Sequence, residues 1–287
     1  MVFRTCWYFF CKYFLSPFPD TLYHNIISFI MHLRFKSKFY WLNIKHPRTF
    51  SEKLQYLKSH PVSPDENILA DKYDVRNFIK ERIGDYYLIP LLKVYDDVDA
   101  IDWNLLPKSF VLKLTKGSGY NLICPDKERL DRNQVLRNLK KWMNVNPYYM
   151  SRELQYKGKP KIVCEKLLEY NITDYKFFCF SGEPLYVEVY MDRFGSHKKL
   201  FYDMQWKKMP FTTANDVCSL DVEKPEKFDE MFNVAKVLSS GLAFVRVDLY
   251  MSNSHVYFGE MTFHPAGGYT PITPREWDFK LGDLIKL

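Results

Sequence analysis

The sequence predicts an α+β fold whose second half is dominated by antiparallel strands. Between residues 51 and 83, apolar side chains recur at helical spacing. From residue 110 onward, short apolar runs alternate with turn residues, as in strands joined by hairpins. The 287 residues are 47% hydrophobic and 26% charged, which excludes global disorder and supplies a core for one large domain or two moderate ones.

The elements can be placed in order along the chain. Between residues 21 and 35, five apolar side chains fall on one helical face: Leu22, Ile26, Phe29, Ile30 and Leu33. A helix beginning at Ser51 and Glu52 follows, and then a second helix over 66–83. Two more helices are predicted over 131–143 and 226–241. Strands are predicted over 86–95, 110–114, 122–124, 162–168, 175–180, 184–190, 244–250 and 256–261.

The net charge of +7 belongs almost entirely to the first 50 residues. That segment holds seven Lys and Arg residues and one acid, Asp20, whereas the rest of the chain holds 34 bases and 33 acids. The body of the protein is therefore nearly neutral, and we expect no nucleic-acid binding.

The same head segment holds fifteen aromatic residues. A cationic, aromatic and amphipathic helix suits the surface of an anionic membrane, and a helical hairpin packed on the main domain is the alternative. No apolar stretch reaches the 18 residues of a membrane span, and no signal peptide is convincing. The six cysteines show no metal-ligand spacing, so we expect reduced thiols in a cytoplasmic protein.

A first candidate site joins a strand lysine to a glycine-rich loop. Lys113 lies in the apolar run 110–114, and Lys116-Gly117-Ser118-Gly119 follows. Glycine allows the backbone to approach a ligand closely, and successive N–H groups can cradle phosphate oxygens. A plain hairpin turn beside a surface lysine is the alternative.

A second candidate site lies on two neighbouring strands. Alternation places Arg246 with Asp248 on one face, and Glu260 with Thr262 on one face. A turn at 252–254 makes the strands antiparallel, so Asp248 and Glu260 can meet across the ladder. Mg²⁺ with substrate phosphates would fill the space between two carboxylates, and Arg246 would hold a negative intermediate. An ion-pair ladder on a solvated face is the alternative.

Two further stretches are weaker candidates. His264 precedes a loop with Gly267 and Gly268, which can admit a substrate anion or form an ordinary turn. The stretch Glu165-Lys166-Leu167-Leu168-Glu169 ends a strand, where backbone groups can meet an adenine edge and an acid can hold ribose hydroxyls. That second pattern is generic by itself.

The order of these motifs resembles the ATP-grasp fold, in which two α+β lobes clamp ATP. The chain is most similar to the TupA-like ATP-grasp proteins, which accompany bacterial capsule, teichuronopeptide and O-antigen gene sets. The stretches that carry this resemblance are FSEKLQYLK (50–58), ADKYDVR (70–76), FVLKLTKGSGYN (110–121), DYKFFCFSGEP (174–184), DRFGSHKKLFYD (192–203), FVRVDLY (244–250), YFGEMTFHPAGGYTP (257–271) and EWDFKLGDL (276–284).

The resemblance implies a division of the chain and a role for each matching residue. The expected parts are a basic aromatic helical extension (1–48), a segment before the grasp (49–108), a small lobe (109–170) and a C-terminal lobe with the metal site (171–287). ATP contacts are implied for Lys113, Lys116, Gly117, Ser118, Gly119, Glu165, Lys166, Leu168 and Lys176. Catalytic roles are implied for Arg246 and Lys113, and Mg²⁺ ligands are implied at Asp248, Glu260 and Thr262. Many ATP-grasp ligases have Asn where this chain has Thr262, whose hydroxyl is a weaker ligand that water could replace. A second, anionic substrate is implied at Arg193, His197, His264, Gly267 and Gly268.

The activity that the resemblance implies is carboxylate–amine ligation with ATP and Mg²⁺ as cofactors. A uronic acid of a surface polysaccharide or its precursor would be amidated through an acyl phosphate, in a bacterial cytoplasm or at the inner face of the membrane. A glycosyltransferase using a nucleotide sugar is the second hypothesis, although no clear DxD motif lies in a Rossmann-like half. A binding protein that kept the fold and lost catalysis is the third.

Overall fold

The computed structural model describes the chain apart from residues 1, 62, 64, 170–171, 192–197 and 214–220. Its strands are β1 (Leu91–Tyr95), β2 (Phe110–Leu114), β3 (Asn121–Cys124), β4 (Ile162–Glu165), β5 (Asp174–Phe180), β6 (Glu183–Met191), β7 (Lys198–Asp203), β8 (Thr212–Thr213), β9 (Phe244–Ser252), β10 (His255–Thr262) and β11 (Ile272–Thr273). They form a four-stranded sheet in the order β1-β4-β2-β3, a five-stranded sheet in the order β10-β9-β5-β6-β7, and a small pair β11-β8. All these named pairs are antiparallel, so the predicted α+β fold is confirmed.

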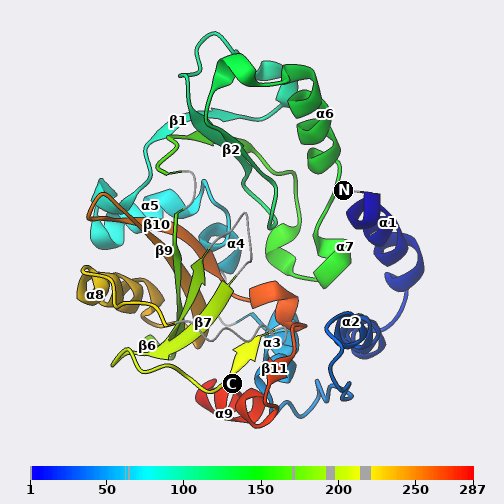
Figure 1. Ribbon diagram of the computed structural model, residues 1–287. Coiled ribbons are helices and arrows are strands. Elements are labelled where there is room, and N and C mark those ends of the chain that lie inside the picture. The colour runs from blue at the N-terminus through cyan, green and yellow to red at the C-terminus, as the bar shows by residue number, and fades with distance from the viewer. Residues whose placement is uncertain (1, 62, 64, 170–171, 192–197, 214–220) are drawn as a thin grey trace.

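The helices surround these sheets (Figure 1). The α-helices are α1 (Val2–Phe10), α2 (Asp20–Arg34), α3 (Phe50–Ser59), α4 (Glu66–Leu69), α5 (Val75–Ile83), α6 (Arg132–Met143), α7 (Tyr148–Ser151), α8 (Phe228–Ser239) and α9 (Glu276–Leu284). Short turns of other helical types are η1 (Cys11–Leu15), η2 (Asp85–Tyr87), η3 (Val98–Ala100), η4 (Lys127–Arg129), η5 (Leu154–Tyr156) and η6 (Pro265–Gly268).

The four-stranded sheet and α6 form the small lobe at the top of Figure 1. The side chains of β2 point alternately to the two faces of the sheet, and Phe110, Leu112 and Leu114 are buried in the core that contains α6. Lys113 therefore lies on the opposite face of this sheet, which is turned away from the core.

The five-stranded sheet has two unlike faces. On one face, Phe177, Val187 and Val247 pack in a core with α5 and α8. On the other, Phe178 and Phe244 pack in a second core with α3 and α9. Even-numbered positions of β5 and β9 share that second face, so Lys176, Arg246 and Asp248 lie beside the α3 and α9 core.

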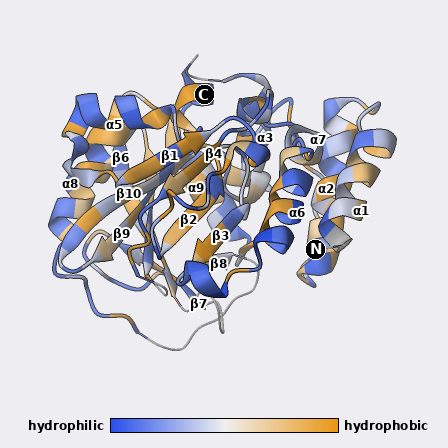
Figure 2. Cartoon of the chain, turned by 90° about the horizontal axis from the view of Figure 1, so that it is seen from above, coloured by the Kyte–Doolittle hydropathy of each residue, from blue (hydrophilic) through white to orange (hydrophobic). Residues whose placement is uncertain are grey.

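Helices α1 and α2 lie on the opposite side of the molecule from α8 (Figures 1 and 2). The hydroxyl of Tyr23 donates a hydrogen bond to the carbonyl oxygen of Tyr149 at 2.8 Å, and His24 Nδ1 lies 2.6 Å from the hydroxyl of Tyr269. The guanidinium of Arg152 stacks 4.0 Å from the centre of the Tyr23 ring. The head segment therefore packs on the main body through buried polar contacts.

One predicted helix is wrong in its extent. Residues 66–83 form two helices, because the side chain of Asp71 accepts hydrogen bonds from the backbone N–H groups of Tyr73 and Asp74 at 2.9 and 3.2 Å. The backbone N–H of Lys72 donates a hydrogen bond to the carbonyl oxygen of Thr115 at 3.2 Å. The break turns Lys72 toward the small lobe.

Several predicted boundaries also shift. The strand predicted over 86–95 begins at Leu91, and the strand predicted over 162–168 ends at Glu165. Strand β7 was not predicted as a strand, and the helix predicted from Ser51 begins at Phe50. Thr49 caps it by accepting from the N–H of Glu52 in a reciprocal capping box.

The division of the chain into four parts stays a prediction. Strand β1 precedes the predicted boundary at residue 108, yet it pairs with β4 of the small lobe. Among the described cysteines Cys6 is exposed and four are buried, and Cys218 lies outside the described residues. In the part of the chain that the structure describes, no helix has the length and apolar character needed to cross a membrane.

Candidate active site

A β-bulge at Gly259 places the acidic residues of β10. The turn pairs Phe258 with Leu249, but beyond the bulge Glu260 pairs with Asp248 and Thr262 with Arg246. Without the extra residue, Glu260 would point into the core beside α5 and α8. A side-chain carbon at Gly259 would lie 2.8 Å from the ring of Tyr250 and 3.0 Å from the carbonyl oxygen of Asp248, so only glycine fits there without a shift of its neighbours.

The predicted pairing of Asp248 with Glu260 is thus confirmed, and three cations surround it. Arg246 Nε lies 2.7 Å from Asp248 Oδ1, and Lys176 Nζ lies 2.5 Å from Asp248 Oδ2. Arg246 Nη2 also lies 3.5 Å from Glu260 Oε1 and 3.2 Å from the Thr262 hydroxyl. The third cation is Lys72, whose Nζ lies 3.3 Å from Glu260 Oε2.

The alternative for these residues was an ion-pair ladder on a solvated face, and the structure shows such a ladder in a largely buried position. The side chain of Asp248 is 2% exposed and that of Arg246 is 13% exposed, whereas Glu260 is 28% exposed. Burial alone would raise the pKa of Glu260, but Lys72, Arg246 and Lys176 lower it to about 2. Burial would lower the pKa of Lys176, yet Asp248 holds it above its ordinary value. The site therefore contains an ionised and partly accessible Glu260 in front of buried ion pairs.

Lys72 connects this cluster to the glycine-rich loop. Its Nζ donates to the carbonyl oxygen of Gly117 at 3.0 Å while it pairs with Glu260. Sequence reasoning did not single out Lys72, although it stands in the stretch ADKYDVR that resembles the family.

In the small lobe, Lys113 forms an ion pair with Glu165. Lys113 Nζ lies 2.7 Å from Glu165 Oε2, and Arg76 Nη1 lies 3.1 Å from Glu165 Oε1. Both oxygens of Glu165 therefore bind protein cations, and its side chain is 8% exposed. This arrangement makes Glu165 the residue that orients Lys113, and Arg76 is a site residue that sequence reasoning missed.

A narrow cavity lies beside Lys113, between the two sheets. The predicted hinge residues Lys166 and Leu168 line it, together with Val111 and Tyr250. Glu169, at the end of the hinge, accepts a hydrogen bond from the hydroxyl of Ser252 at 2.6 Å. This cavity has the apolar walls that a purine base needs.

The predicted ATP contact at Lys116 is not brought to this place. Lys116 Nζ donates to the carbonyl oxygen of Lys157 at 2.7 Å, so its charge is bound outside the cluster. Gly117 and Ser118 do line a large cavity, which Arg246 and Glu260 also line. Gly119 lies next to Arg4, whose nitrogen would be 3.1 Å from an added side-chain carbon.

The loop with Gly267 and Gly268 is fastened to α3. Gln55 Nε2 donates to both glycine carbonyls at 3.0 and 2.9 Å, and Lys58 Nζ donates to that of Gly267 at 2.6 Å. A side-chain carbon at Gly268 would lie 2.6 Å from Gln55 Nε2 and 2.9 Å from Leu54, which requires glycine at this close approach. Burial lowers the pKa of Lys58 to about 7, against the opposing effect of Glu153.

His264 is buried behind the same loop. Its Nδ1 lies 3.6 Å from Glu153 Oε2 and 3.3 Å from Gln155 Nε2, and burial lowers its pKa. The remaining predicted substrate contacts, Arg193 and His197, lie outside the described residues.

A cavity of 620 Å³ joins these groups. Arg246, Glu260 and Thr262 line one part of it, and His264 and Gly267 line another. Of the eight predicted site residues of the C-terminal lobe that the structure describes, five therefore line one space.

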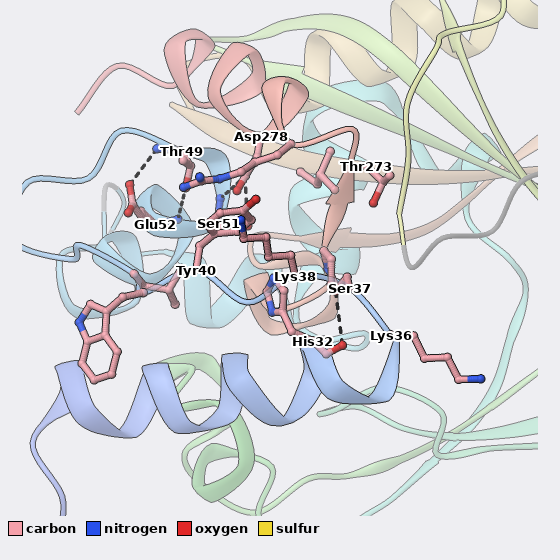
Figure 3. Close-up of a pocket in the computed structure, with 15 residues that line it drawn as sticks. His32, Lys36, Ser37, Lys38, Tyr40, Thr49, Ser51, Glu52, Thr273 and Asp278 are labelled. Atoms are coloured by element: carbon pink, nitrogen blue, oxygen red, sulfur yellow. Dashed lines mark hydrogen bonds between the residues drawn. The ribbon is translucent and has the colours of Figure 1, made fainter.

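A second cavity of 270 Å³ contains none of the predicted site residues (Figure 3). Its acids are satisfied locally: Glu52 accepts from the N–H groups of Arg48 and Thr49 at 2.8 and 3.0 Å, and Asp278 accepts from that of Ser51 at 2.9 Å. In Figure 3 Lys36 points away from this space. These contacts hold the start of α3 in place.

Two α+β lobes facing each other across ionic side chains are the architecture of the ATP-grasp class. A family model for TupA-like ATP-grasp proteins matches residues 52–286, so the chain belongs to the TupA-like ATP-grasp family. The family predicted from the motifs is therefore confirmed.

The solved structures that align with this chain include a synthetase and a ligase. An N5-carboxyaminoimidazole ribonucleotide synthetase in complex with ADP aligns with a TM-score of 0.46 and 13% identity, over 74% of this chain and 50% of that chain. A D-alanine–D-alanine ligase from Bacillus anthracis in complex with ATP aligns with a TM-score of 0.44 and 14% identity, over 76% of this chain and 63% of that chain. This chain thus spans between half and two thirds of the length of these structures. No curated protein matches the sequence.

Proposed function

We propose that this protein is an ATP- and Mg²⁺-dependent ligase that joins a carboxylate to an amine. The observation that carries the proposal is the buried cluster of Asp248, Arg246 and Lys176 with the accessible, ionised Glu260 at the head of a 620 Å³ cavity. Such a cluster neutralises the charge that develops during phosphoryl transfer, which is the main task of an enzyme for this chemistry.

The donor set fits Mg²⁺. Within the described residues, no group of three or more His, Cys, Asp or Glu side chains is arranged to hold a metal ion by itself. Mg²⁺ is ordinarily bound by one or two carboxylates together with substrate phosphates and water, so Glu260 with Thr262 or water can hold it at the cavity. Asp248 would join them by giving up its contacts with Arg246 and Lys176. When bound, the ion would neutralise phosphate oxygens and orient them.

The protein residues then have separate tasks in the proposed reaction. Lys113, oriented by Glu165, binds ATP phosphates from the small lobe, and Lys72 holds the glycine-rich loop closed over them. The substrate carboxylate attacks the γ-phosphorus and ADP leaves, which forms an acyl phosphate. The amine then attacks the acyl carbon, loses a proton and expels phosphate, so that an amide results. Arg246 stabilises the negative charge on the acyl carbon's oxygen.

Nucleotide binding and ADP release test this function. We expect ATP with Mg²⁺ to raise the melting temperature, because a ligand that binds only the folded state stabilises it by mass action, and we expect no shift with UDP-glucose. ADP release should then require both a uronate and an amine. A shift with UDP-glucose instead of ATP would support the glycosyltransferase hypothesis and overturn the ligase.

For the carboxylate we propose a uronic acid of a bacterial surface polysaccharide or its precursor, at the inner face of the membrane. The support for the membrane is the outer surface of α1, η1 and α2. Its exposed apolar side chains are Phe9, Phe10, Tyr13, Phe14, Phe18, Leu22, Phe29 and Leu33. Exposed aromatic groups next to an excess of cations suit a surface of anionic lipid.

Vesicle binding tests this membrane surface. We expect sedimentation with vesicles that contain phosphatidylglycerol, and weaker sedimentation with purely zwitterionic vesicles. Replacing Tyr13 and Phe14 (61% and 68% exposed) by serine should weaken binding severalfold. Leu105→Ser, at an equally exposed position of the small lobe (75% exposed), is the matched control and should bind as the wild type does. Equal loss in both variants would contradict the proposal.

A further inference from the structure

The large cavity has two unlike ends. Arg246, Glu260 and Thr262 form the reactive end. The other end is walled by α1 and α2, which lie before the range 52–286 that the family model matches. The protein therefore adds a wall of its own to the space in which the reaction is proposed to take place.

The residues of this wall follow the helical repeat. On α2, Ile27, Met31 and Arg34 are spaced four and three residues apart, so they form one stripe. On α1, Arg4 and Trp7 are three residues apart and line the same cavity. The wall is thus an apolar surface with a cation at either side.

The two cations differ in their partners. Arg4 donates to the carbonyl oxygen of Ser118 at 2.5 Å and stacks 4.1 Å from the centre of the Tyr120 ring, so it fastens α1 to the glycine-rich loop. Arg34 is exposed, and within the described part of the chain it forms no ion pair; its ring contact is with Phe35 at 5.7 Å. Neither α1 nor α2 contributes an acid to the cavity lining.

The wall is held rigidly. The contacts of Tyr23 with Tyr149 and of His24 with Tyr269 are buried or partly buried, and they connect α2 to α7 and to the end of η6. A preformed wall loses little entropy when a ligand binds to it.

We propose that this wall is a subsite for the body of the carboxylate substrate, and that it binds an acidic saccharide. A sugar ring would pack its C–H face on Trp7 and Met31 while its reacting carboxylate reaches Arg246. The carboxylate of a neighbouring sugar unit would meet Arg34. This inference rests on the proposed ligase function and extends it from a single uronic acid to an acidic oligosaccharide.

Binding of galacturonate, digalacturonate and trigalacturonate tests the subsite. The full-length protein is saturated with Mg²⁺ and a non-hydrolysable ATP analogue, and the saccharides are titrated by calorimetry. We expect the affinity to rise about tenfold from the monomer to the trimer, since a charge-assisted contact is added at Arg34. Arg34→Gln should remove most of this gain, and Trp7→Leu should lower the affinity for the trimer.

The control is Lys36→Gln, which removes the same charge two residues along the chain at a side chain that points away from α2 (Figure 3). It should keep the full gain. Equal affinities of wild type for monomer and trimer, or equal behaviour of the Arg34 and Lys36 variants, overturn the subsite. If the ATP analogue itself fails to bind, the ligase function fails and the subsite with it; if the analogue binds, only the subsite is at stake.

Discussion

Glu260→Gln is expected to reduce ATP-dependent turnover at least about a hundredfold while the fold stays intact. The substitution keeps the shape of the side chain but removes the charge that pairs with Lys72 and would bind Mg²⁺. Because Glu260 is the more exposed of the two carboxylates, we expect its loss to lower the melting temperature less than the loss of Asp248 does. ADP release and thermal unfolding, measured on the same preparation, check both parts.

Asp248→Asn is the informative companion. Its carboxylate is 2% exposed and is the nearest acid of both Arg246 and Lys176. The variant leaves these cations only their longer contacts, that of Lys176 with Asp174 at 3.3 Å and that of Arg246 with Glu260 at 3.5 Å. Breaking a buried pair in this way costs about 3–5 kcal/mol. We therefore expect Asp248→Asn to lose activity and stability together.

For the first variant, full activity of Glu260→Gln over a range of Mg²⁺ concentrations would contradict the proposed metal site.

Gly259→Ala is expected to raise the KM for ATP about tenfold and to destabilise the protein by about 1–3 kcal/mol, the usual cost of overpacking. The added methyl group would lie 2.8 Å from the ring of Tyr250, and Tyr250 lines the cavity beside Lys113. Relief of this clash pushes the ring toward the space proposed for the adenine. Steady-state kinetics in ATP and thermal unfolding measure the two effects.

Gly241→Ala is the control for this variant. Gly241 lies in the turn before β9 at a φ of +80°, and nothing lies within 4 Å of an added side-chain carbon. It should lose stability through backbone strain and keep the KM for ATP. A Gly259→Ala protein with the KM and the melting temperature of the wild type would show that the bulge tolerates a side chain.

Local patterns predicted much of this site because they depend on neighbours in the chain. Strand alternation placed Lys113 opposite the core, and the short turn at 252–254 predicted that β9 and β10 are antiparallel neighbours. The motifs also predicted the family that the comparison confirmed. Lys72 was missed because its position depends on a break in the helix predicted over 66–83. The side chain of Asp71 causes this break, although the apolar residues continue at helical spacing.

Ion-pair partners were harder to predict than positions. The ATP contact at Glu165 stays a prediction, and its carboxylate pairs with Arg76 and Lys113, two partners that the sequence did not indicate. Lys116 donates to the carbonyl oxygen of Lys157, a partner that the sequence did not indicate either, and its ATP contact stays a prediction. These partners are distant in sequence, so no spacing rule connects them.

The residue types and their order were enough to predict the α+β class and the family. They also indicated the kind of reaction for which these acids and cations are suited. Tertiary structure decided which way the acids face. A regular hairpin would pair Glu260 with Val247 and turn it into the core, and the single extra residue at Gly259 turns it to the cavity instead. Successive side chains of a strand point to opposite faces of the sheet, so a shift of one residue moves each side chain to the other face. The close packing of Tyr250 against the bulge is a contact that only the folded chain makes.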